Sequence, residues 1–168
     1  MYQRIIITIL LTMAYFLLPK YGFTSYDSGL TGHLLYPISH ANIFHLLGNV
    51  LCLWMLRCPL HIGICYAIAV LCGFLPCLTS EPTMGFSGVL FAMAGISWGR
   101  TGKFGMMCRK CLPYILICVL IPHVNVMIHV YCLMAGYLYG TLKIEDPIAK
   151  YDGYNGISGF SGRKGGRK

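Results

Sequence analysis

The chain alternates long apolar runs with short polar connections, and this pattern predicts a bundle of membrane-spanning helices. Glycine, proline and charged residues separate six such runs, which we expect to form helices at about residues 5–18, 41–56, 61–78, 87–98, 112–121 and 124–142. The fourth run has only about twelve residues, which rise roughly 18 Å, whereas the hydrocarbon core of a bilayer is about 30 Å thick. We therefore expect this helix to begin inside the membrane, below a cavity that surrounds the irregular chain before it.

The composition favours a polytopic membrane protein over a soluble domain. Of the 168 residues, 57% are hydrophobic and only 11% are charged, far from the balance of soluble domains. The first apolar run resembles the core of a signal peptide, but no cleavage-site pattern follows it and five more runs do, so we expect a retained helix. We expect one domain at residues 1–142, followed by a cytoplasmic, disordered basic tail at residues 143–168.

The basic residues lie in short clusters between the apolar runs. The formal net charge is +8, but this distribution is typical of topology determinants and disfavours a nucleic-acid surface. If alternate connections lie on opposite sides of a membrane, one side has only Lys20. The other side collects, besides the distal tail, Arg4, Arg57, Arg100, Lys103, Arg109, Lys110, Lys143 and Lys150. We therefore expect both termini to be cytoplasmic, with the lipid bilayer as a partner and no nucleic acid.

The nine cysteines do not indicate a disulfide framework, because most of them lie inside apolar runs, where cysteine acts as a small hydrophobe. Cys108 and Cys111 form a single CxxC pair without a second pair or a nearby histidine, which is a poor zinc motif. We expect neither a metal nor a cofactor.

The candidate chemistry begins at Gly85-Phe86-Ser87-Gly88, which sets a hydroxyl at the start of the fourth helix. Backbone N–H groups at a helix start can hold an oxyanion, although glycine and serine in membrane helices usually serve packing. His129 lies five residues into the last helix, about 8 Å deep against roughly 12 Å for Ser87, so the two are nearly level. A histidine that only hydrogen-bonds within the bundle is the structural alternative.

Stripes of small residues predict that the fourth and sixth helices approach closely. They comprise Gly88, Ala92, Gly95 and Gly99 on one helix and Cys132, Gly136 and Gly140 on the other. Matching these stripes places Ser87 beside His129, which can act as its general base. No Asp or Glu lies inside a predicted helix, so a dyad replaces a Ser-His-Asp triad.

Polar residues of the second predicted helix and of its entrance lie near this site. His45 and Asn49 are four residues apart and share one helix face at the same depth, where both can donate to an oxyanion. His40 lies near the entrance of the helix, where a structural clamp is the better interpretation.

The pattern HxxxxHxxxN at His40, His45 and Asn49, with GxSG at residues 85–88 and His129 on the last helix, resembles the rhomboid family of intramembrane serine proteases. The resemblance implies an all-α membrane protein, a six-transmembrane-helix bundle with a short central fourth helix. It implies Ser87 as nucleophile, His129 as general base, His45 and Asn49 as the oxyanion hole, and His40, Gly85, Gly88 and Phe91 as supporting residues.

The chain departs from the family pattern at several positions. Phe91 stands where a tyrosine usually packs on the base, Cys132 replaces a glycine, and Ile128 replaces a common alanine. The family often has an aromatic-arginine pair in the first connection, but residues 20–39 contain neither tryptophan nor arginine.

The resulting hypothesis is a serine endopeptidase that cleaves peptide bonds in or near transmembrane segments of membrane-protein substrates. The alternative is a non-catalytic membrane adaptor that binds client transmembrane helices. A small transporter is a weaker hypothesis, because the predicted helices contain no carboxylate for ion coupling.

Overall fold

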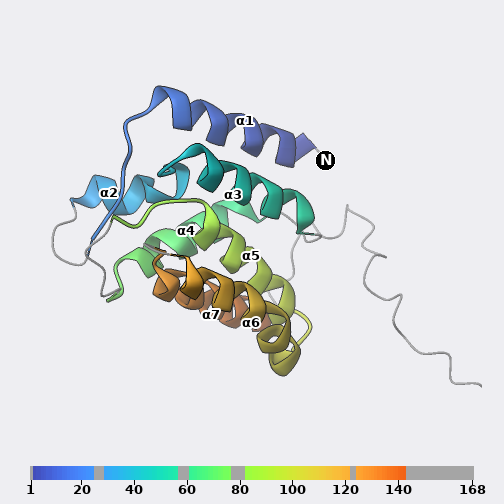
Figure 1. Ribbon diagram of the computed structural model, residues 1–168. Helices are drawn as coiled ribbons and strands as arrows, with labels where there is room; N and C mark the ends of the chain where they lie inside the picture. The colour runs from blue at the N-terminus through green and yellow to red at the C-terminus, as the bar shows by residue number, and fades with distance from the viewer. Residues whose placement is uncertain (1, 25–28, 57–60, 77–81, 122–123, 143–168) are drawn as a thin grey trace, which may run out of the picture.

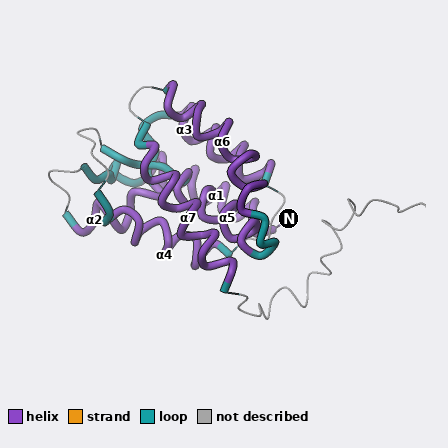
Figure 2. The backbone as a smooth tube through the Cα atoms, turned by 90° about the horizontal axis from the view of Figure 1, so that it is seen from below, coloured by secondary structure: helices purple, strands orange, loops and turns teal. Residues whose placement is uncertain are grey.

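A computed structural model describes residues 2–24, 29–56, 61–76, 82–121 and 124–142, and in these ranges the protein is all-α, as predicted (Figure 1). Most of the described residues are helical (Figure 2), and the described β-structure is one isolated bridge between Phe23 and Thr83. The helices are α1 (Tyr2–Leu17), α2 (Leu30–Leu35), α3 (Ile43–Met55), α4 (Ile62–Gly73), α5 (Ser87–Gly99), α6 (Phe104–Leu120) and α7 (Val126–Thr141), with a 3₁₀ turn, η1, at Tyr36–Ile38.

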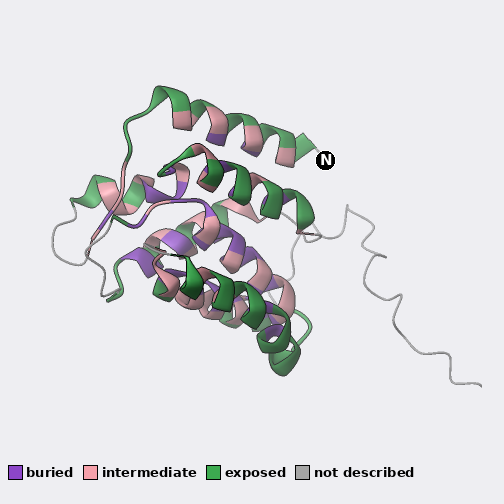
Figure 3. Cartoon of the chain, in the orientation of Figure 1, coloured by how far each residue is buried: buried purple, intermediate pink, exposed green. Residues whose placement is uncertain are grey.

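Helix α5 is the centre of the fold. It packs along α7 and against α4, and eight of its thirteen residues are buried. Helix α1 packs on α3, and α6 packs on α5 and α7. The outward faces of α1, α3 and α6 are exposed (Figure 3), and these faces carry large apolar side chains such as Phe16, Phe44 and Leu120.

The α5–α7 interface brings two helix backbones into direct contact. A Cβ added at Gly95 would lie 2.2 Å from the carbonyl oxygen of Leu133, and one at Gly136 would lie 2.3 Å from that of Ala92. Gly99 and Gly140 have equally close backbone neighbours in the same interface. The predicted contact between the two small-residue stripes is therefore confirmed.

The first connection holds the chain that leads to α5. Phe23 and Thr83 exchange backbone hydrogen bonds of 3.2 and 2.7 Å, and the Gly85 N–H donates to the Tyr36 carbonyl at 2.9 Å. The buried Tyr36 hydroxyl in turn donates to the carbonyl of Ala69 in α4 at 2.8 Å. Residues 20–39 were expected only as a polar connection, but they contain α2 and η1 and fix the segment before α5.

One expected connection was wrong. Residues 99–111 were predicted as a basic loop, but α6 begins at Phe104 and continues past Pro113. Met107 and Cys111 are one turn apart and pack as a buried cluster with Leu133 of α7, whereas Arg109 and Lys110 remain exposed. The charges therefore occupy exposed positions of an amphipathic turn and do not interrupt the helix.

None of the described helices is by itself long and apolar enough to cross a membrane. The segment Leu30–Ile38 and helix α3 meet that requirement when they are taken together, by length and composition alone. The two parts of this pair are bent by 65° relative to each other. Helix α4 ends at Gly73, earlier than expected. The expected tail at residues 143–168 and the connections at residues 57–60 and 77–81 lie outside the described residues, so the tail remains a prediction.

The α5–α7 contact predicts opposite effects for one chemical change at two helical glycines. Gly136→Ala inserts a methyl group against backbone and should lower the free energy of unfolding by about 1–3 kcal/mol. Gly48→Ala in α3 meets nothing within 4 Å and should be neutral or stabilising by up to about 1 kcal/mol. Thermal unfolding followed by circular dichroism measures both, and equal effects would contradict the packing.

Candidate active site

Ser87 and His129 lie in hydrogen-bond contact, as predicted. Ser87 is the first residue of α5, and His129 lies in the first turn of α7. The Ser87 Oγ lies 2.8 Å from the His129 Nε2, and the histidine is only 4% exposed. A neutral imidazole in this position can accept the serine proton. The placement is confirmed, whereas the catalytic roles stay predictions.

The ring of His129 is held from one side by Phe91, one helical turn after Ser87. The two rings stack with centroids 4.7 Å apart and an interplanar angle of 18°. The Nδ1 atom of His129 is buried without a hydrogen-bond partner among the described residues, which include no Asp or Glu. The described site is therefore a dyad oriented by packing. Ser87 can donate its proton to Nε2 only in the tautomer of the neutral ring that carries its proton on Nδ1.

His45 and Asn49 reach the turn that precedes Ser87. Gly85 has φ +120°, and a Cβ added there would lie 2.6 Å from the His45 Nε2 and 3.4 Å from the Asn49 Nδ2. This glycine is thus required both for its backbone conformation and for the approach of the imidazole.

The donors at this turn fit an oxyanion. The Asn49 amide donates one hydrogen to the His45 carbonyl at 3.1 Å, which leaves its second hydrogen available. The backbone N–H groups of the first turn of α5, beginning at Ser87, are unpaired within the helix. Together these groups could stabilise negative charge that develops next to the serine hydroxyl.

His40 lies behind His45. It is fully buried, and its ring packs edge-on against the His45 ring with centroids 5.3 Å apart. Neither ring nitrogen of His40 has a hydrogen-bond partner among the described residues. The contact supports the position of His45 and does not bring His40 to the dyad.

Asn125 and Thr83 connect the segments that carry His129 and Ser87, and this connection was not foreseen. The Asn125 side chain caps α7 by accepting from the Ile128 N–H at 3.4 Å, and its Nδ2 donates to the Thr83 Oγ1 at 2.7 Å. The loop before Ser87 and the helix that carries His129 are therefore tied together. An asparagine directly before an apolar run is a helix N-cap signal that could have identified Asn125.

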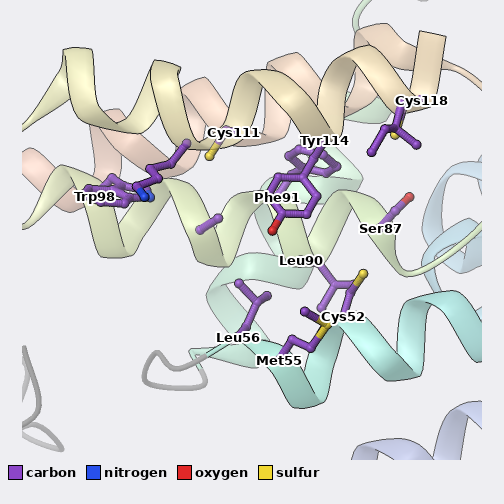
Figure 4. Close-up of a pocket in the computed structure, with 13 residues that line it drawn as sticks. Cys52, Met55, Leu56, Ser87, Leu90, Phe91, Trp98, Cys111, Tyr114 and Cys118 are labelled. Atoms are coloured by element: carbon purple, nitrogen blue, oxygen red, sulfur yellow. The ribbon is translucent and has the colours of Figure 1, made fainter. Parts of the chain in front are cut away.

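A cleft of about 400 Å³ opens from Ser87 between α3 and α6, with α5 as its floor (Figure 4). Its walls are mainly apolar, with Cys52 and Met55 on α3 and Tyr114 and Cys118 on α6. Helices α3 and α6 do not pack on each other within the described ranges. This mainly apolar cleft runs from Ser87 along α5 toward Trp98, whereas the cavity expected from the sequence surrounds the chain before Ser87, so that cavity stays a prediction.

No known family model matches the chain, and a search of curated proteins finds no significant match. Among the described residues no group of three His, Cys, Asp or Glu side chains could hold a metal ion. In the CxxC pair, Cys108 is exposed and Cys111 is buried, so the two face different surroundings.

Two variants test the connection between the loop and α7. Asn125→Ala removes the helix cap and the Thr83 bond, and it should lower the free energy of unfolding by about 1–2 kcal/mol. Thr83→Val keeps the cap and removes only the hydroxyl, so a smaller loss of about 1 kcal/mol is expected. Chemical denaturation measures both, and a Thr83→Val loss larger than that of Asn125→Ala would contradict this arrangement.

Proposed function

We propose that the chain is a rhomboid-type intramembrane serine endopeptidase. The observation that carries the proposal is the 2.8 Å contact between the Ser87 Oγ and the His129 Nε2, with His45 and Asn49 beside the adjoining turn. A serine paired with a general base and facing oxyanion donors is the arrangement that acyl transfer requires.

The proposed reaction has two halves. The Ser87 Oγ attacks the carbonyl carbon of the scissile peptide while His129 Nε2 takes its proton, and the carbonyl oxygen becomes an oxyanion near Asn49 and His45. The C–N bond then breaks, and the proton on Nε2 passes to the leaving amine. Water, deprotonated by the same nitrogen, attacks the acyl-enzyme, and the carboxylic acid leaves as Ser87 regains its proton.

The surface supports placement in a bilayer as a multi-pass protein. Large apolar side chains are exposed on the outer faces of α1, α3 and α6, as expected where lipid is the solvent. Helices α1, α6 and α7, at 16 or 17 residues, rise about 24–26 Å, so the proposal includes local thinning of an approximately 30 Å core. The basic residues then orient both termini toward the cytoplasm.

The proposed substrates are transmembrane segments that unwind readily. A peptide carbonyl within a helix is hydrogen-bonded and shielded by its neighbours, so it must leave the helix before Ser87 can attack it. Glycine or proline near the scissile bond lowers that cost.

Covalent labelling tests the dyad. A fluorophosphonate should label the wild-type protein at Ser87, fail to label Ser87→Ala, and label His129→Ala at least about 100-fold more slowly, because general-base catalysis contributes at least that factor. Ser97→Ala, on the same helix, is the matched control and should label at the wild-type rate. Labelling that persists in Ser87→Ala, or none in the wild type, contradicts the proposal, and the latter favours the adaptor alternative.

Cleavage of a model single-span substrate tests the oxyanion donors. Asn49→Ala should lower kcat by about 10²- to 10³-fold with little change in KM, because the lost bond is made mainly in the transition state. Leu47→Ala, on the exposed face of α3, is the control. A wild-type kcat in folded Asn49→Ala would remove this residue from the proposed oxyanion hole.

A further inference from the structure

The α3–α6 cleft continues well beyond the dyad. Along α5 its lining runs from Ser87 through Leu90, Phe91 and Ala94 to Trp98, a distance of about 16 Å at the helical rise. Apolar side chains and thiols dominate the walls, as the close-up shows (Figure 4). The cleft is therefore an elongated, mainly apolar channel that is partly open, with Ser87 at one end.

The opposite end carries a cation. Lys110 of α6 lines the cleft beside Trp98, and its side chain is exposed. The described residues contain no carboxylate that could pair with it. In the proposed orientation this end faces the cytoplasm, where lysine and tryptophan side chains reach the headgroup level. A channel that is apolar along its length and cationic at its mouth suits an amphiphile with an anionic head.

The length of the cleft suits an acyl chain. The acyl chains of one leaflet fill half of an approximately 30 Å core, so each is about 15 Å long. One such chain matches the length of about 16 Å from Ser87 to Trp98 along α5.

We propose that the α3–α6 cleft binds one acyl chain of an anionic phospholipid from the cytoplasmic leaflet, with the headgroup phosphate paired to the Lys110 ammonium. The inference rests on the membrane placement in the proposed function. The bound chain ends near Ser87, where a substrate segment would have to displace it.

Tryptophan fluorescence can test this site in the full-length chain. The protein has two tryptophans, Trp54 and Trp98, and Trp54→Phe leaves Trp98 in the cleft as the reporter. The variant is reconstituted in vesicles that contain phosphatidylglycerol or phosphatidylcholine with brominated acyl chains, which quench tryptophan at contact. Brominated phosphatidylglycerol should bind about fivefold more tightly than brominated phosphatidylcholine, the preference expected for one lysine at a lipid headgroup.

Three further variants in this background locate the preference. Lys110→Gln should remove it and Lys110→Arg should keep it. Lys103→Gln, which removes the same charge from an exposed position outside the cleft lining, should also keep it. Equal quenching by the two lipids, a preference that survives Lys110→Gln, or one lost equally in Lys103→Gln overturns the proposal.

Fluorophosphonate labelling in the same vesicles reports the proposed function separately. If the protein is labelled at Ser87 but shows no preference for phosphatidylglycerol, the lipid site alone is overturned. If it shows the preference but is not labelled, the lipid site is supported and the protease proposal is overturned. A chain that does not incorporate into vesicles overturns both.

Discussion

The backbone contact between α5 and α7 is the constraint on which the site depends. In the proposed bilayer, lipid tails are as apolar as leucine, so helix association relies on close packing and not on the hydrophobic effect. Gly95 and Gly136 let each helix approach the carbonyl groups of the other, which fixes both separation and register. Ser87 and His129 lie in the N-terminal turns of these two helices. The 2.8 Å contact between their side chains therefore follows from the backbone packing further along α5 and α7.

The parts around this pair differ in how firmly they are held. The chain before Ser87 is fixed by backbone bonds to Phe23 and Tyr36 and by the Asn125 bond to Thr83. Helix α3 supplies His45 and Asn49 from the other side, through the space left by Gly85. Helices α3 and α6 leave the cleft between them. Ser87 and His129 are thus on the tightly packed core, while the cleft lies between two helices, α3 and α6, that do not pack on each other in the described part of the chain.

Periodic patterns explain what could be predicted from the sequence. The small-residue stripes and the matching depths of Ser87 and His129 were sufficient to place the dyad, because both depend only on helical spacing. The start of α6 was missed because basic residues suggested a loop, whereas Met107 and Cys111 show the buried side of a helical turn. The hydrogen bonds of Tyr36 and Thr83 join segments far apart in the chain. Such partners could not be predicted, because no local sequence pattern indicates them.

The rate at which a fluorophosphonate labels folded Gly136→Ala tests most directly whether helix packing sets the dyad. The added methyl group touches neither Ser87 nor the probe, but it forces α7 away from α5. A displacement of about 1 Å at reacting groups can lower a rate by about 100-fold, so we expect a loss of that order at a temperature where circular dichroism shows full folding. Labelling at the wild-type rate in the folded variant would contradict the account.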